Sequence, residues 1–157
     1  MSGRVRLPAR TRTDFMDRAV VDCPRCDGYA TVTTPGERPE DRTSHQWLTF
    51  GPKRMVCRDC GASTDQPETP MGVLARPTMG LTPRLRAETR HGVLVALNEA
   101  ELDYLEAYVG GRLREEVVEP GGPKNRTVIS RLPTWAKASK NRDEVLRAIR
   151  KVRETRL

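Results

Sequence analysis

Hydrophobic and polar residues alternate in three short stretches of the N-terminal half of the chain. The stretches are Tyr29–Thr34, His45–Phe50 and Arg54–Cys57, and each contains β-branched or aromatic residues. Alternation over about four to eight residues is typical of a strand with one buried face. A polar loop near Pro35–Arg42 separates the first two stretches, and Gly51-Pro52 separates the second from the third. The pattern therefore predicts a small sheet of three strands.

The C-terminal half begins with a pattern that predicts a β-hairpin followed by a helix. Arg84–Thr89 and Val93–Leu97 are strand-like runs, joined by a turn at Arg90-His91-Gly92. Asn98 and Glu101 have the spacing of a capping box, which predicts a helix start. The hydrophobic stripe that follows has helical spacing. Its members are Leu102, Leu105, Val109 and Leu113.

Two glycines, Gly110 and Gly111, lie inside this stripe. Together they cost a helix about 2 kcal/mol relative to alanine, so either the helix ends there or another backbone packs closely against it. Because Leu113 keeps the period, we expect close packing and a helix that continues through Leu113.

Two more helices are predicted towards the C-terminus. The segment Thr127–Lys140 has one apolar face, and Pro133 is expected to end or kink that helix. Asn141 and Glu144 form a second capping box, which predicts the start of the last helix. Its buried stripe consists of Val145, Leu146, Ile149 and Val152.

The four cysteines carry the most specific signal in the chain. They form two pairs, Cys23-Pro-Arg-Cys26 and Cys57-Arg-Asp-Cys60, separated by 30 residues. Two such pairs indicate a tetrahedral site of four thiolates that holds one Zn²⁺ ion. Four thiolates leave no open position for water, so this zinc is expected to be structural. Gly28 and Gly61 follow the pairs and suit a tight turn, because glycine accepts a positive φ.

Disulfides, redox chemistry and an iron–sulfur cluster are the alternative uses of these cysteines. Disulfides need an oxidising compartment, and Met1–Phe15 contains no apolar core of a secretory signal. A transit peptide is the alternative for this arginine-rich segment, although Pro8 interrupts any helix in it. A redox C-x2-C motif uses one pair in a βαβ context, and the paired spacing favours zinc over an iron–sulfur cluster. We therefore expect zinc, reduced thiols and a cytoplasmic protein.

The segment 21–63, with its motifs CPRC and CRDCG, resembles zinc ribbons of the transcription-factor-IIB type. The resemblance implies a zinc ribbon fold and a role in transcription or its regulation. Relatives of that ribbon bind RNA polymerases or nucleic acids, or only brace a larger protein. From ALNEAELDYLEAYVGGRLRE to SRLPTWAKASKNRDEVLRAIRK, the C-terminal half resembles the second part of a bacterial group of small stand-alone zinc-ribbon proteins, which implies no settled activity.

These elements predict an α+β protein with an N-terminal three-stranded zinc ribbon and a C-terminal β-hairpin with about three helices. We expect four regions along the 157 residues. They are a flexible basic segment (1–20), the zinc ribbon (21–64), a linker rich in proline and glycine (65–83), and the hairpin and helical module (84–157).

Composition excludes an integral membrane protein. The longest unbroken apolar run is Val93–Leu97, far shorter than the roughly 20 residues that span a bilayer.

The formal net charge is +7, and the last 34 residues carry 11 basic and 3 acidic side chains. This clustering points to an anionic partner. The candidate nucleic-acid-binding residues are Arg142, Arg147, Arg150, Lys151 and Arg153. The alternative is a solvated helix face whose bases favour the helix dipole.

Enzyme motifs are absent. The chain contains no G-x-x-x-x-G-K-[ST], no G-x-S-x-G, no H-E-x-x-H and no dinucleotide fingerprint. His91 is expected to be a turn residue, so we expect no catalytic residues and no small-molecule substrate. Two functions from different classes remain. The first is a nucleic-acid-binding protein, for DNA or RNA, and the second is a protein–protein adaptor that docks on a larger complex such as RNA polymerase.

Overall fold

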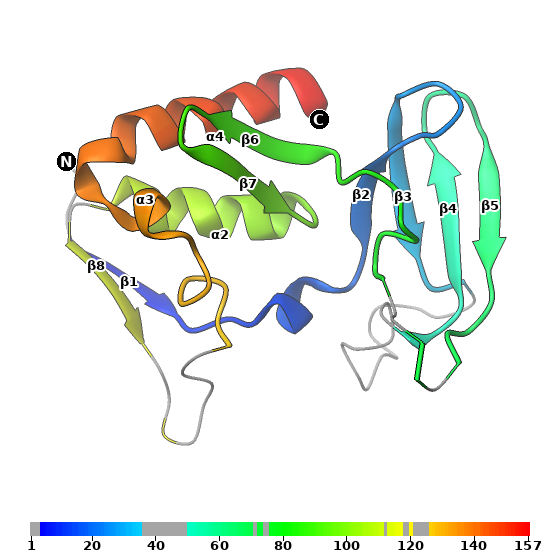
Figure 1. Ribbon diagram of the computed structural model, residues 1–157, viewed down its shortest axis with the longest axis horizontal. Helices are drawn as coiled ribbons and strands as arrows, with labels where there is room; N and C mark the ends of the chain where they lie inside the picture. Colours follow the sequence, from blue (N-terminus) through cyan, green and yellow to red (C-terminus); the bar gives the residue numbers. More distant parts are fainter. Residues whose placement is uncertain are drawn as a thin grey trace.

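The computed structural model describes residues 4–35, 50–70, 72–73, 76–111, 113–117, 120 and 126–157. The fold is α+β, as predicted. A four-stranded antiparallel sheet lies at one end of the molecule, and a β-hairpin packed with helices lies at the other (Figure 1). No helix within the described ranges is long and apolar enough to cross a membrane.

The four-stranded sheet has the order β2-β3-β4-β5. Its strands are β2 (Ala19–Asp22), β3 (Tyr29–Thr33), β4 (Lys53–Cys57) and β5 (Ser63–Gln66). The strands β3 and β4 confirm two of the three predicted strands. Residues 45–49 of the third lie outside the described residues, and Phe50, its last residue, is helical and not extended as predicted.

The sequence pattern did not predict two strands of this sheet, β2 and β5, and it missed both for the same physical reason. The first three residues of β2 are all buried, and all four residues of β5 are exposed, so neither strand alternates. A four-stranded sheet therefore replaces the three-stranded one expected from alternation.

The predicted hairpin is confirmed. Strand β6 (Leu85–Thr89) pairs with β7 (Gly92–Ala96), and Arg90 and His91 form the two-residue turn between them. Leu85, Ala87, Leu94 and Ala96 are buried in the core that the hairpin shares with the helices.

The helix α2 (Glu99–Gly110) begins as predicted and ends earlier than predicted. The Asn98 side chain accepts a hydrogen bond from the Glu101 N–H, so it is the N-cap. The prediction of a helix through Leu113 is wrong, because Gly111 is extended and Leu113 begins β8 (Leu113–Val117). The close packing expected at the two glycines is also not observed at Gly110. A side chain at Gly110 would meet only the Leu146 side chain, at 3.9 Å.

Strand β8 returns along the N-terminal strand β1 (Arg4–Pro8), with which it forms a parallel pair. A short 3-10 helix, η1 (Arg12–Phe15), follows β1. Residues 1–20 were expected to form a flexible segment, and within the described part they contribute a strand, this helix and the start of β2.

The helix predicted over Thr127–Lys140 is divided. Residues 128–131 form turns, and Pro133 is the N-cap of a short helix, α3 (Thr134–Lys137), which leads to η3 (Ser139–Asn141). Pro133 therefore begins a helix, since its missing N–H is not needed there.

The last helix, α4 (Arg142–Arg156), is confirmed, and Val145, Ile149 and Val152 of its predicted stripe are buried. The second capping box is wrong. Asn141 makes no side-chain cap bond and donates from Nδ2 to the Trp135 carbonyl at 3.0 Å. The Glu144 carboxylate instead accepts from the Arg90 N–H.

Each of the two hydrophobic cores contains residues from the other end of the molecule. Val20 and Tyr29 of the sheet are buried with the helical residues, whereas Leu97 is buried with the sheet. Part of the predicted linker also contacts the sheet, because Met79 and Leu81 pack against its core.

Candidate metal centre and basic helix

The four cysteines lie on two turns that the sheet brings together. The first, here called the first knuckle (Cys23–Gly28), joins β2 to β3, and the second knuckle (Cys57–Ala62) joins β4 to β5. Because β3 pairs with β4, Ala30 lies opposite Cys57, and both knuckles lie at the same end of the sheet.

The backbones of the two knuckles are hydrogen-bonded in the same way. The Cys23 N–H donates to the Gly28 carbonyl at 2.9 Å, and the Cys57 N–H donates to the Ala62 carbonyl at 2.8 Å. The N–H of the residue after the second cysteine donates back to the carbonyl of the first cysteine in both knuckles. Each turn therefore points its two cysteines to the same side.

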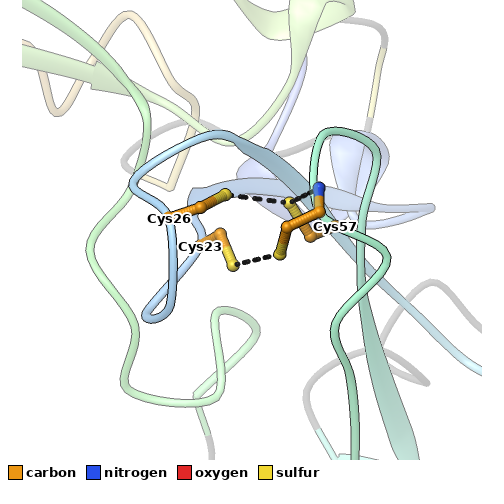
Figure 2. A group of neighbouring side chains, drawn as sticks. Cys23, Cys26 and Cys57 are labelled. Atoms are coloured by element: carbon orange, nitrogen blue, oxygen red, sulfur yellow. Dashed lines mark hydrogen bonds between the residues drawn. The ribbon is translucent and has the colours of Figure 1, made fainter.

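The four sulfurs form one cluster. The Sγ atoms of Cys23 and Cys60 are 3.7 Å apart, those of Cys26 and Cys57 are 3.5 Å apart, and all four lie within 4.8 Å of one another. In Figure 2, Cys23 and Cys26 on one loop face Cys57 on the other. A tetrahedral site with metal–sulfur bonds of about 2.3 Å would place its sulfurs about 3.8 Å apart. The donor set and its spacing therefore fit a single metal ion.

The cluster has a buried side and an exposed side. Cys23, directly after β2, and Cys57, the last residue of β4, are buried, whereas Cys26 and Cys60 are exposed. None of the four forms a disulfide. The sequence predicted these four residues as ligands, and the structure brings all of them together.

The two knuckles treat their sulfurs differently. The N–H groups of Cys60 and Asp59 donate to the Cys57 sulfur and lower the pKa of this thiol to about 7. At Cys26, the Gly28 N–H lowers the pKa, but contact with the Cys57 thiol, desolvation and the other two thiols raise it to about 12. Two N–H groups therefore stabilise a thiolate at Cys57, against one at Cys26.

The two glycines that the sequence singled out have different roles. Gly61 has a φ of 75°, as expected for a tight turn, but the residue with positive φ in the first knuckle is Asp27, at 60°. Gly28 is needed for a different reason, because an added Cβ would lie 2.9 Å from the Asp59 Cβ and closer still to its Oδ2.

Asp59 is a structural residue of the site that sequence reasoning missed. Its Oδ2 accepts a hydrogen bond from the Tyr29 N–H at 2.7 Å, and the Arg58 N–H donates to the Tyr29 carbonyl at 2.8 Å. The Arg58 guanidinium also lies 4.1 Å from the centre of the Tyr29 ring. These contacts fasten the second knuckle to the strand that leaves the first. The only available signal was an acidic residue inside a C-x2-C motif.

The five predicted nucleic-acid-binding residues fall into separate environments on α4. Arg153 donates to Glu106 at 2.8 Å and also contacts Asp103, both on α2. Arg150 lies 3.8 Å from Glu106 and its side chain is 61% exposed. Arg142 is partly buried, while Arg147 and Lys151 are exposed and form no ion pair with any described residue.

His91 occupies the hairpin turn, as predicted. Its ring stacks on Trp135 with 6.0 Å between the centroids, and its Nε2 lies 3.5 Å from the Glu144 carboxylate. Gly92 permits this packing, because an added Cβ would lie 3.0 Å from the Trp135 ring.

Comparisons with family models, curated proteins and solved structures found no match for this chain.

Proposed function

We propose that the protein is a non-enzymatic, cytoplasmic zinc-ribbon protein of the transcription-factor-IIB type that binds nucleic acid, DNA or RNA, through contacts with the phosphate backbone. One structural Zn²⁺ would be held by Cys23, Cys26, Cys57 and Cys60. A role in transcription or its regulation follows from this proposal.

The chemistry of the donor set supports zinc. Four sulfurs lie within 4.8 Å of one another on two knuckles, and sulfur-only tetrahedral sites suit Zn²⁺. Four protein ligands leave no position for a substrate, so the ion would hold the two knuckles together and activate no water.

Nucleic-acid binding is supported by one observation: the outward face of α4 has three exposed basic side chains. Arg147 and Lys151 form no ion pair with a described residue, and Arg150 lies 3.8 Å from Glu106. Arg147, Arg150 and Lys151 are spaced by three and four residues from Arg147, so they share a face. That face points away from the buried stripe of α4. We exclude Arg153 from the proposed contact, because Asp103 and Glu106 already neutralise it.

The same face also bears acidic side chains. Asp143 lies four residues before Arg147, and Glu154 lies three residues after Lys151. The contact is therefore expected to be small, limited to phosphates, and without base specificity.

The experiment compares two variants that each lose three positive charges. In the test variant Arg147, Arg150 and Lys151 are changed to glutamine, and in the matched control Arg10, Arg126 and Arg131 are changed to glutamine. Affinity for a labelled duplex DNA and a labelled RNA hairpin is measured from low to high salt. Each neutralised phosphate contributes about −0.9 to the slope of log K against log salt, so the test variant should flatten it by about two to three units.

The control separates a local site from net charge. Equal loss in both variants would mean that affinity follows net charge alone. If the test variant binds both nucleic acids as well as the unmodified protein at every salt concentration, the basic side chains of α4 only face solvent and bind no nucleic acid. The second candidate, an adaptor that docks on a larger complex such as RNA polymerase, would then replace nucleic-acid binding.

A further inference from the structure

We propose that the outer edge of β7 is a docking groove for an extended, acidic peptide segment of a partner protein. The segment would add to the β6–β7 hairpin as a third strand. This proposal concerns a different surface from the basic face of α4 and does not depend on nucleic-acid binding.

The first argument is the unpaired edge of the hairpin. The sheet has only two strands, and β6 lies along α4, while β7 lies on the side of the loop that leads to α3 (Figure 1). Thr89 is paired with Gly92 across a two-residue turn, so Val93 and Val95 occupy the positions whose backbone groups point away from β6. Among the described residues, no strand pairs with this edge. An exposed edge of this kind is a template for another strand.

The second argument is the shape of the surface along this edge. Two hollows of about 250 Å³ and 440 Å³ adjoin each other, and Arg12 and Val95 line both. Together they follow the chain from Val93 to Leu97. Two adjoining hollows along a strand edge suit an extended chain better than a compact small molecule.

The groove has apolar walls that could receive alternate side chains of such a segment. Val93 is 50% exposed, and Val128 and Leu132 line the same hollow. Met16 and Pro77 line the second hollow. Strand addition uses pockets of this type for specificity, while the backbone hydrogen bonds supply affinity.

The third argument is charge. Four arginines line the two hollows, and Glu101 is the one carboxylate among the described lining residues. The arginines are Arg12, Arg76, Arg126 and Arg131, and all four are exposed.

Glu101 pairs with only one arginine of this cluster, Arg12. Its carboxylate is buried and accepts a hydrogen bond from the Leu97 N–H at 3.0 Å, and it lies 3.8 Å from the Arg12 guanidinium. Arg76, Arg126 and Arg131 form no ion pair within the described part of the chain. The groove is therefore complementary to an acidic segment.

The lining favours a peptide over a nucleic acid. No tryptophan, tyrosine or phenylalanine is among the described residues that line the two hollows, so bases would have no stacking platform there. An open strand edge with valine side chains instead offers backbone hydrogen bonds and apolar contacts, which a peptide can use.

The test uses the full chain and an acetylated, fluorescein-labelled eight-residue peptide of alternating valine and glutamate. The comparison peptide alternates valine and lysine, and binding is measured by fluorescence anisotropy up to 1 mM protein. We expect the acidic peptide to bind at least tenfold more tightly than the basic peptide.

Two variants probe the two parts of the site. R126E/R131E should weaken binding of the acidic peptide at least tenfold. V93P removes one outward N–H without breaking the ladder to β6, because proline is tolerated at an edge position that faces solvent. V93P should weaken binding about fivefold or more. The control R147E/K151E reverses the same number of charges on α4 and should bind the peptide within twofold of the unmodified protein.

Thermal unfolding and hydrogen exchange separate lost binding from lost folding. V93P and R126E/R131E should melt within a few degrees of the unmodified protein, and the peptide should slow exchange of the Val93 and Val95 amides. A V93P variant that melts much earlier would be replaced by this exchange measurement on the unmodified protein.

Several outcomes would overturn the proposal. They are no binding of the acidic peptide up to 1 mM, equal binding of the acidic and basic peptides, and unchanged exchange at Val93 and Val95. If a labelled oligouridylate binds and R126E/R131E abolishes its binding while V93P does not, the groove is a nucleic-acid site. The nucleic-acid proposal for α4 is judged separately, because its test variant changes Arg147, Arg150 and Lys151, none of which lines this groove.

Discussion

The two cysteine knuckles have equivalent backbone hydrogen bonds, but different residues occupy equivalent positions in them. The residue after the second cysteine has a positive φ in both: Asp27 at 60° in the first knuckle and Gly61 at 75° in the second. A side chain in this left-handed region costs about 1–2 kcal/mol, and aspartate tolerates it better than most residues. The second knuckle avoids this strain, and the first does not.

The two knuckles also differ in how their backbone N–H groups are distributed over the cysteine sulfurs. In the second knuckle the N–H groups of Asp59 and Cys60 both donate to the Cys57 sulfur, at 3.3 and 3.4 Å. In the first knuckle the Cys23 sulfur accepts from the Arg25 N–H at 3.4 Å and the Cys26 sulfur from the Gly28 N–H at 3.3 Å. The second knuckle thus concentrates its donors on one buried thiolate.

The connection between the knuckles also runs one way. The Asp59 carboxylate of the second knuckle accepts a hydrogen bond from the Tyr29 N–H, directly after the first knuckle. In the described part of the chain, side chains of the first knuckle form hydrogen-bonding contacts with the second only through the cysteine sulfurs. Asp59 thus adds a side-chain hydrogen bond to the backbone bonds that the two knuckles share, and the described contacts give the first knuckle no residue that acts in the same way.

Replacing a cysteine of the proposed zinc site should have the largest effect, and the effect should be the same for both knuckles. C23S and C57S are each expected to lose the metal and unfold the ribbon, since structural Zn²⁺ sites supply about 10–16 kcal/mol of apparent binding free energy. Metal content per chain and thermal unfolding, with and without a chelator, measure the effect. A C23S protein that keeps both its metal and its melting temperature would show that four thiolates are not required.

Alanine substitutions at Gly28 and Gly61 should have the next largest effect, and the loss of stability should differ between the two knuckles. G28A pushes a Cβ to 2.9 Å from the Asp59 Cβ and displaces the carboxylate from the Tyr29 N–H, so we expect a loss of about 2–4 kcal/mol. G61A meets no atom within 4 Å and suffers only from its φ, so a loss of about 1 kcal/mol is expected. Urea unfolding of the metal-loaded variants measures both. Equal losses would mean that backbone conformation alone limits these positions.

The cysteines and Gly28 show how much of the candidate site could be predicted from the sequence. The C-x2-C spacing identifies Cys23, Cys26, Cys57 and Cys60, because the spacing itself fixes a knuckle with two sulfurs on one side. The reason for Gly28 was wrong, since it depends on Asp59, which is 31 residues away in sequence and lies against it only in the folded sheet. Contacts between distant segments leave no local pattern.

The same limit applies to the fold. The hairpin β6–β7 and the start of α2 were predictable, because turn residues and a capping residue are local signals. The end of α2 was not, because the period of Leu113 matched a helix while its actual partner is β1, more than 100 residues earlier in the chain. The polar strand β5 likewise forms because β4 offers it an edge, not because of its own pattern.

The Asp59 carboxylate should have a moderate effect, and it tests the direction of dependence between the knuckles. D59A removes the hydrogen bond to the Tyr29 N–H and should cost about 1–1.5 kcal/mol. In a double-mutant cycle, G28A should cost less in the D59A background than in the unmodified protein, since part of the clash disappears. Urea unfolding of the four proteins gives the coupling energy. Additive losses would show that Gly28 and Asp59 act independently.

Asp27 should give the smallest effect, and its sign is the sharpest test of the comparison. D27G relieves the strain of a φ of 60°, which is worth about 1–2 kcal/mol, but it makes the unfolded chain more flexible, which costs about 0.4–1 kcal/mol. Because the hydrogen bond to Arg84 uses the Asp27 carbonyl, the substitution keeps it. We therefore expect a net gain of about 0.5 kcal/mol in urea unfolding. The matched variant D27A keeps the strain and loses the tolerance of aspartate for this region, so it should be destabilised by about 0.5–1 kcal/mol. If D27G is instead less stable than the unmodified protein and D27A is neutral, the first knuckle is not the strained one, and the asymmetry between the knuckles rests on Asp59 alone.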